Sequence, residues 1–256
     1  MNLIKLMKYA VAGWLPFGQR RCLICDHNVW RFMPYRGGWA YAPALMRVLD
    51  VIGSDLDSFE CPRCGSHDRE RHLLLYLRAS GLLAEMAGKA VLHFAPEKRL
   101  SRVIAVVDSA RYVRCDLYPR QPDIERVDML DMGFESGSFD VLIANHVLEH
   151  VSDDRQALAE IFRVLKVGGY AVLQTPYSNK LHHTWQDEGI VGGDIRLLAY
   201  GQEDHVRLYG RDIFDRFSAA GLVSRVRSHS DLLPDVDIVK LGVNPAEPFM
   251  LFQRID

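Results

Sequence analysis

One continuous stretch of this 256-residue chain specifies a strand, a helix, a turn and a second strand in succession, and it constrains the fold more than any other segment. Residues Phe139 to Ala144 form a short, unbroken apolar run, which is typical of a strand covered by helices on both faces. Residues 145–151 then leave this strand at its carboxyl end. That edge is where open α/β sheets bind their ligands.

Apolar residues at helical spacing follow this strand and predict an amphipathic crossover helix. These residues are Leu158, Ile161, Phe162 and Leu165. We expect Asp153, Asp154 and Glu160 to face water, and the first two suit the positive end of the helix dipole. Gly168 and Gly169 lie where a left-handed residue would end the helix. The stretch therefore predicts a parallel βαβ unit.

The composition is that of an ordinary globular protein, with 48% hydrophobic and 25% charged residues, and it excludes disordered and fibrous classes. A net charge of −2 argues against a nucleic-acid partner, although a local basic patch stays open. No apolar run approaches the roughly 18 residues that span a bilayer. We expect a cytoplasmic protein in a reducing compartment, because four of the five cysteines form two Cys-x-x-Cys pairs.

The amino-terminal residues 1–17 mix apolar side chains with Lys5 and Lys8. Pro16 and the lack of a small-residue cleavage site make them a poor fit to a signal peptide. We favour a helix that packs on the protein, with peripheral membrane or partner contact and disorder as alternatives. We divide the chain into an amphipathic segment (1–21), a cysteine-bearing module (22–67) and one α/β domain (68–256).

The two cysteine pairs predict a metal site made of Cys22, Cys25, Cys61 and Cys64. A two-residue gap lets both sulfurs of a pair point at one ion, so we expect tetrahedral Zn²⁺. Four thiolates leave no open position, which indicates a structural metal. Free buried cysteines or a redox pair are the alternatives. Acidic residues cancel most basic charge in the module, which favours a substrate-capping or protein-docking role over nucleic-acid binding.

Several motifs together resemble class I S-adenosylmethionine-dependent methyltransferases of the type 11-like group. The resemblance rests first on the run from Phe139 to Leu173. An Ala-Pro-Glu turn at 95–97, the knuckle at 61–66 and the segment 204–212 resemble a zinc-knuckle-bearing subgroup. The resemblance implies a doubly wound, mostly parallel seven-stranded Rossmann-like sheet with one antiparallel strand, beside a small zinc module. A Gly-x-Gly-x-x-Gly turn, which a nicotinamide-binding fold would need, is missing.

The resemblance also implies a cofactor site, although the first loop departs from the family pattern. Where the family has an acid and two glycines, this chain has His93, Ala95 and Glu97. Small Ala95 permits close approach of the backbone to the methionine part of the cofactor, whereas Glu97 is not expected at positive φ.

Further cofactor contacts are implied at the ends of the following segments. Asp116 ends the strand 111–117 and is expected to accept hydrogen bonds from the ribose hydroxyls. Asp128 is expected to meet the adenine amino group, and the backbone amide of Met129 the adenine ring. Asn145 is expected to border the methyl donor.

Two histidines are candidate general bases for the proton of a hydroxyl or amine acceptor, His146 and His205. For His146 we favour the alternative of a histidine that only lines the pocket, and a metal site with His150 is a further alternative that lacks an evident third ligand. The long segment 175–210 reads as a lid or substrate-binding wall before the next helix. There Arg207 either grips an anionic group or pairs with Asp204.

The sequence thus predicts an S-adenosylmethionine-dependent methyltransferase that acts on a small-molecule or glycan acceptor, with oxygen the first choice. The alternative is a non-catalytic adaptor, in which the altered first loop has lost the cofactor and the zinc module binds a partner. A zinc-ribbon enzyme that modifies nucleic acid is a third hypothesis, which the charge balance disfavours.

Overall fold

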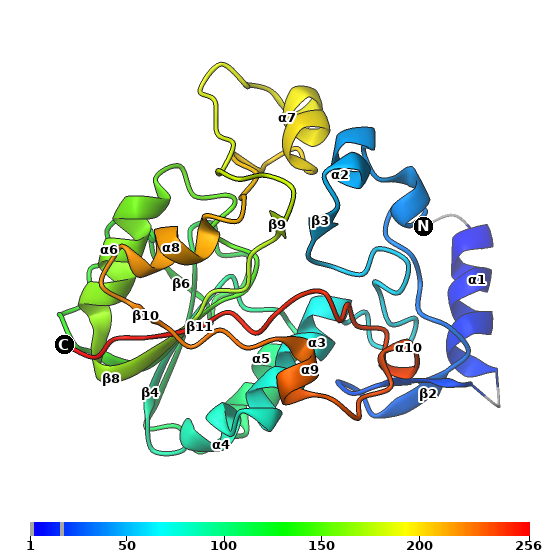
Figure 1. Ribbon diagram of the computed structural model, residues 1–256. Coiled ribbons are helices and arrows are strands. Elements are labelled where there is room, and N and C mark those ends of the chain that lie inside the picture. The colour runs from blue at the N-terminus through cyan, green and yellow to red at the C-terminus, as the bar shows by residue number, and fades with distance from the viewer. Residues whose placement is uncertain (1–2, 16–17) are drawn as a thin grey trace.

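A seven-stranded sheet organises the computed structural model, which describes residues 3–15 and 18–256. Its strands follow the order β10-β11-β8-β7-β4-β5-β6 (Figure 1). Their bounds are Ala90–Phe94 (β4), Arg111–Asp116 (β5), Glu125–Arg126 (β6), Phe139–Ala144 (β7), Leu165–Val172 (β8), Val223–Ser224 (β10) and Leu251–Gln253 (β11). Only β11 runs antiparallel to its neighbours β8 and β10. The predicted Rossmann-like methyltransferase fold is confirmed, including its single antiparallel strand.

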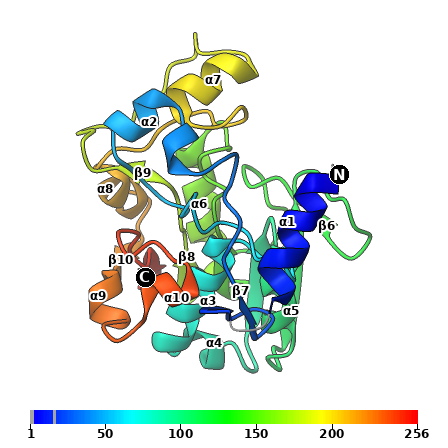
Figure 2. The ribbon, with the colours of Figure 1, turned by 90° about the vertical axis from the view of Figure 1, so that its right-hand side faces the viewer.

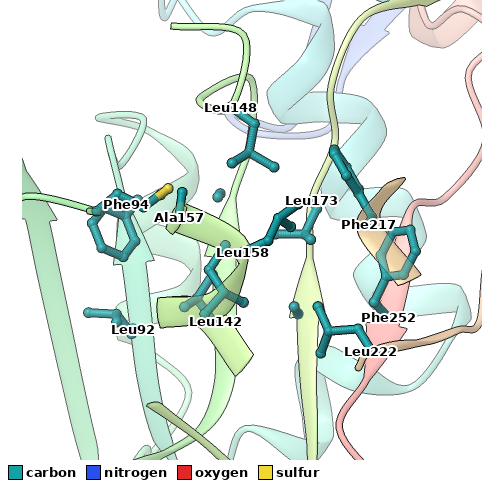
Figure 3. Packing of buried hydrophobic residues seen from close by; sticks show 14 of the residues in the cluster. Leu92, Phe94, Leu142, Leu148, Ala157, Leu158, Leu173, Phe217, Leu222 and Phe252 are labelled. Carbon is teal, nitrogen blue, oxygen red and sulfur yellow. The ribbon is translucent and has the colours of Figure 1, made fainter. Parts of the chain in front are cut away.

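Helices cover both faces of this sheet because its central strands are apolar on both sides. On β7, Leu142 belongs to one buried cluster with residues of α6 (Asp154–Val164) and α8 (Ile213–Ser218). Figure 3 shows it beside Leu158 of α6. The alternate residues Val141 and Ile143 pack with α3 (Asp68–Ala79), α4 (Leu82–Glu85) and α5 (Leu100–Ala105). This double burial is the physical reason for the unbroken apolar run.

The β7–α6–β8 unit forms as predicted, but two details were wrong. Asp154 and Glu160 are buried instead of facing water. The glycine pair does not end the helix, since α6 ends at Val164 and β8 follows directly. Gly168, at φ 84°, lies inside β8 at a bulge, where the register with β7 shifts between Phe139 and Val141.

The amino-terminal part forms a separate layer beside the sheet. Helix α1 (Leu3–Trp14) precedes the β1–β2 hairpin (Arg20–Cys22 and His27–Val29), then come η1 (Trp39–Tyr41), α2 (Ala44–Val48) and β3 (Val51–Ile52). Helix α1 stands against this layer (Figure 2): Tyr9 donates to Glu60 at 2.7 Å, and the Arg63 guanidinium lies 4.1 Å from the Trp14 ring centroid. Most of its apolar side chains are nevertheless exposed. The remainder of the predicted segment, residues 1–2 and 16–17, lies outside the described residues.

Arg71 of α3 connects the amino-terminal layer, which contains the four paired cysteines, to the elements that cover the sheet. Its buried guanidinium donates to five backbone carbonyl groups, at Ser58, Phe59, Ser66, Leu241 and Gly242. It also lies 3.8 Å from the ring centroid of Phe32. A second connection is the antiparallel pairing of β3 with β9 (Tyr177–Ser178). The amino-terminal layer is therefore connected to the rest of the protein at two places, through Arg71 and through the β3–β9 pairing.

The segment 175–210 is long, as predicted, but it contains a helix that the sequence analysis missed. Helix α7 (Gly193–Tyr200) packs against α2, and the two lie side by side in Figures 1 and 2. Short helices α9 (His229–Leu232) and α10 (Ile238–Leu241) precede β11. Among the described residues, no helix combines the length and apolar character required to cross a membrane.

Candidate functional site

The loop after β4 carries the first of the predicted cofactor residues and turns sharply at Ala95. Ala95 has φ 45°, a left-handed conformation that is uncommon for residues other than glycine and worst for β-branched ones. Its amide donates to the carbonyl of Cys115 at 2.8 Å, so the loop stays attached to β5. The exposed Ala95 thus takes the backbone geometry that a glycine usually provides.

Three of the predicted cofactor residues form one polar cluster behind this turn. Asn145 Nδ2 donates to Glu97 Oε1 at 2.5 Å, and His93 Nε2 lies 3.3 Å from Glu97 Oε2. Burial opposes ionisation of Glu97, but His93 outweighs it and lowers the pKa of the carboxyl group. Glu97 Oε2 and Asn145 Oδ1 are buried without a hydrogen-bond partner. Two acceptor atoms at the carboxyl ends of β4 and β7 are therefore unsatisfied.

The other predicted cofactor residues lie at the carboxyl ends of β5 and just after β6. Asp116 is half-buried, and its Oδ1 accepts from the Tyr118 amide at 2.8 Å. Asp128 is exposed, and its Oδ1 accepts from the Leu130 amide at 2.9 Å. The side chain of Met129 is buried in the core. The two carboxylates thus reach solvent on the side of the sheet where the Ala95 turn lies.

His146 follows β7 and lies between two carboxylates. Its Nδ1 is 3.4 Å from Glu149 Oε1, and its Nε2 is 3.5 Å from Glu247 Oε1. Burial opposes the imidazolium, but the two carboxylates outweigh it and raise the pKa of His146 to about 9. Glu247 also contacts His72 at 3.1 Å, and His72 contacts His229 at 2.9 Å. Sequence reasoning missed this buried chain, whose members come from four distant segments.

His205 is buried and lies on the other side of Glu149. Its Nδ1 lies 3.0 Å from the carbonyl oxygen of Tyr200, and its Nε2 lies 4.0 Å from Glu149 Oε1. Burial lowers the pKa of His205. Burial would raise the pKa of Glu149, but the surrounding histidines outweigh it and lower this pKa to about 2. Glu149 was not among the predicted site residues, although it lies inside the run 139–150, which contains β7 and the loop after it.

Arg207 has neither of the two roles expected for it. Its fully buried guanidinium donates to the carbonyls of Leu148, Val151 and Ser152, between 2.5 and 2.8 Å, and to Gln186 Oε1 at 2.9 Å. Its nearest carboxylate is Asp154 at 3.9 Å, whereas Asp204 contacts His150. Arg207 therefore fixes the loop after β7 and is not open to a substrate anion.

The four predicted zinc ligands lie together in the amino-terminal layer. The sulfurs of Cys22, Cys25, Cys61 and Cys64 all lie within 4.8 Å of one another. Cys22 and Cys61 are buried, and Cys25 and Cys64 are partly exposed. Ser66 also faces the cluster, with its Oγ 3.3 Å from Cys22 Sγ. The donor set and its convergence fit a tetrahedral metal.

Part of the sheet domain, which carries the predicted cofactor residues, is similar to known proteins. Residues 85–173, from the end of α4 to just past β8, match the family model described as a methyltransferase domain, which is about a third of the chain. An arsenite methyltransferase of Mus musculus is 37% identical over 86 residues, which cover 29% of this chain and 23% of that protein. An uncharacterized protein in transposon TN4556 of Streptomyces fradiae is 31% identical over 103 residues, 40% of this chain and 26% of that one. The matched part thus spans about a quarter of either relative.

Solved structures resemble the chain over a larger share at low identity. An S-adenosylmethionine-dependent methyltransferase from Mesorhizobium loti shares 16% identity over 70% of this chain and 97% of its own, with a TM-score of 0.46. A putative S-adenosylmethionine-dependent methyltransferase from Listeria monocytogenes shares 13% identity over 72% of this chain and 100% of its own, with a TM-score of 0.47.

Proposed function

We propose that this protein is an S-adenosylmethionine-dependent methyltransferase that acts on a small-molecule or glycan acceptor at an oxygen atom. The observation that carries the proposal is the carboxyl edge of β4, β5 and β7. There the Ala95 turn, the Glu97–Asn145 pair and Asp116 lie together. All of them fall within residues 85–173, the region that matches the methyltransferase domain model.

The residues at this edge fit the parts of the cofactor by their chemistry. The unsatisfied Glu97 Oε2 and Asn145 Oδ1 are acceptors, which suit the ammonium group of the methionine part. Asp116 offers a carboxylate to two ribose hydroxyls, and exposed Asp128 offers one to the adenine amino group. The small side chain of Ala95, at a left-handed turn, would let the backbone come close to the ligand.

When bound, S-adenosylmethionine supplies a methyl group on an activated sulfonium sulfur. The chain then has mainly to align an acceptor oxygen with that methyl group and to exclude water. His146 contacts carboxylates through both ring nitrogens, and His205 faces Glu149, so both histidines suit a wall of the acceptor pocket. We propose that alignment, more than proton transfer to a dedicated histidine, is the contribution of these side chains.

Isothermal titration calorimetry with S-adenosylmethionine and S-adenosylhomocysteine tests the proposal. We expect the wild-type protein to bind both, and Asp116→Ala to bind about 10- to 100-fold more weakly, because hydrogen bonds to a charged group contribute about 1.5–3 kcal/mol. Asp123→Ala is a matched control, since Asp123 is an exposed acid after the same strand and pairs with Arg114. Absence of binding by the wild type would favour the adaptor alternative, and equal affinity of Asp116→Ala would remove the ribose assignment.

We also infer that the four cysteines hold a structural Zn²⁺. The support is the convergence of four sulfurs from two Cys-x-x-Cys turns, with no fifth position left for a substrate. Because metal binding and folding of such layers are coupled, Cys61→Ser should lower zinc content and stability together. Cys115→Ser is the control, since Cys115 lies buried in β5, away from the cluster. Full zinc retention by Cys61→Ser, measured by elemental analysis, would contradict the four-thiolate site.

A further inference from the structure

A second group of potential metal ligands lies beside the proposed acceptor pocket. Glu149, His150 and His205 each offer one ligand atom, and these atoms all lie within 4.8 Å of one another. Glu149 Oε1 is 4.0 Å from His150 Nε2 and 4.0 Å from His205 Nε2. The sequence had suggested His146 with His150, but His146 points to Glu247 on its far side. The missing third ligand comes from the loop after α7.

The atoms that face one another in this group are all acceptors. His205 Nδ1 lies 3.0 Å from the Tyr200 carbonyl, and His150 Nδ1 lies 3.3 Å from Asp204 Oδ2. Since a carbonyl and a carboxylate only accept, the proton of each neutral imidazole lies on Nδ1, and Nε2 then keeps its lone pair for a metal. Each of these Nε2 atoms lies 4.0 Å from Glu149 Oε1.

The Glu149 carboxylate has three histidines within 4.0 Å but no hydrogen bond. Both oxygens of Glu149 and the Nε2 of His205 are buried without a hydrogen bond, and the Glu149 side chain is 1% exposed. Buried polar atoms are normally paired, and a buried charge is paired or bound to a metal. His146 Nδ1 lies 3.4 Å from Glu149 Oε1, at ion-pair distance, but both carboxylate oxygens still lack a hydrogen bond. A cation among these atoms would engage both imidazoles and the carboxylate together.

The groups that contact Glu149, His150 and His205 are of the kind that hold metal ligands in place. A ligating histidine usually donates its second nitrogen to a backbone carbonyl or a carboxylate, which are the partners of His205 and His150. The Val206 amide donates to the Glu149 carbonyl at 2.9 Å, and Arg207 bonds to Leu148 and Val151 on either side. The two ligand-bearing segments are therefore fixed to each other.

We propose that Glu149, His150 and His205 bind a divalent transition-metal ion in an open, three-ligand site. Two imidazoles and one carboxylate suit zinc, iron or manganese, and leave coordination positions for other groups. The side chain of His150 is 31% exposed, so the site can be reached from solvent. Ligand atoms around such an ion lie about 3.3 Å apart, given bonds of about 2.0 Å, so the observed 4.0 Å spacings must shorten slightly.

The role of this ion rests on the proposed function. Glu149 follows Asn145 and His146, which border the proposed methyl donor, so the ion would lie on the acceptor side of the crevice. There it would hold an acceptor hydroxyl and lower its pKa, so that the proton passes to solvent water at the open side of the site while His205 serves as a ligand. The substrate class that this predicts is a hydroxyl compound able to coordinate a metal.

Manganese is a suitable probe because Mn²⁺ prefers imidazole and oxygen ligands over thiolates, so it reports this site and not the four cysteines. With the full-length, zinc-loaded protein, free Mn²⁺ is followed by its electron paramagnetic resonance signal. We expect one Mn²⁺ to bind per chain, and Glu149→Gln and His205→Gln each to weaken binding at least tenfold. His183→Gln should bind as the wild type does, because His183 is exposed on the neighbouring loop.

Two results would overturn the site: no uptake of Mn²⁺ at millimolar concentration with only one zinc per chain, or unchanged affinity in both ligand variants. If a buried variant fails to fold, judged by circular dichroism, the partly exposed His150→Gln takes its place. Calorimetry with S-adenosylmethionine is run in parallel without added Mn²⁺. Manganese uptake without cofactor binding would support the metal site while refuting methyl transfer.

Discussion

Asp154, the first residue of α6, is the group whose replacement should most clearly reveal how the site is held. The buried Asp154 carboxylate accepts from Tyr209 Oη at 2.8 Å and from two nitrogens of Arg216 at 2.5 and 2.6 Å. The guanidinium of Arg207, which is fully buried, lies 3.9 Å away. Asp154→Asn keeps the shape of the side chain but removes the only carboxylate within 4 Å of Arg207 among the described residues.

The expected cost follows from these contacts. Breaking a buried ion pair by removing one partner costs about 3–5 kcal/mol, because the other charge stays buried without compensation. Asparagine still offers one acceptor oxygen, and Arg207 keeps its carbonyl partners, so we expect the lower end, about 3 kcal/mol. In a chain of 256 residues this loss lowers the melting temperature by roughly 6–12 °C.

The assay is urea unfolding at neutral pH, with Asp153→Asn as the control. Asp153 is the exposed cap of α6, accepting from the amides of Arg155 and Gln156, and asparagine caps a helix as well as aspartate does. A loss below 1 kcal/mol in Asp154→Asn, or an equal loss in Asp153→Asn, would refute the reasoning.

The pH dependence of the same variant gives an independent check. Burial opposes the Asp154 carboxylate, but Arg216 and Arg207 outweigh it and lower its pKa. A depressed pKa contributes stability that is fully present above the unfolded value, near 3.9, and is lost as the pH falls through the lower folded value. The difference between wild type and Asp154→Asn should therefore be constant at neutral pH and shrink below about pH 4.

Three further predictions concern the frame of the site. Arg71→Lys should lower the free energy of unfolding by about 2–4 kcal/mol, because an ammonium group cannot reach five carbonyls. The same variant should lose zinc to a chelator faster than the wild type, and an unchanged rate of zinc release would contradict this. Gly169→Ala should cost about 1–3 kcal/mol in the same assay, since its Cβ would lie 2.9 Å from a backbone oxygen, and a neutral effect would show that the bulge relaxes. Ala95→Val should weaken S-adenosylmethionine binding in calorimetry, because a β-branched residue disfavours φ 45°; equal affinity would show that the turn is not needed.

The sequence predicted those features that depend on local pattern. The apolar run 139–144 predicted a central strand, because a strand buried on both faces is apolar at successive positions. The helical spacing predicted α6, because a helix buried along one side carries apolar residues every three or four positions. The two Cys-x-x-Cys pairs predicted a cluster that the structure brings together. These signals need only neighbouring residues.

Features that depend on distant partners could not be predicted in this way. Asp154 was expected in water because an acid is assigned to the surface unless a remote Arg216 is known to meet it. Glu149 looked like an ordinary polar residue until His205 was placed beside it by the segment after α7. The positive φ of Ala95 was equally hidden, since glycine is the usual sign of that conformation.

The position of β11 affects how this protein has to be synthesised. Residues 251–253 insert between β8 and β10, so neither strand has that neighbour until these residues have been translated. Until then the nascent polypeptide presents the outer side of β8 as an open template for other chains. Pairing with β11 therefore closes an edge of β8 that forms about 80 residues earlier in the chain.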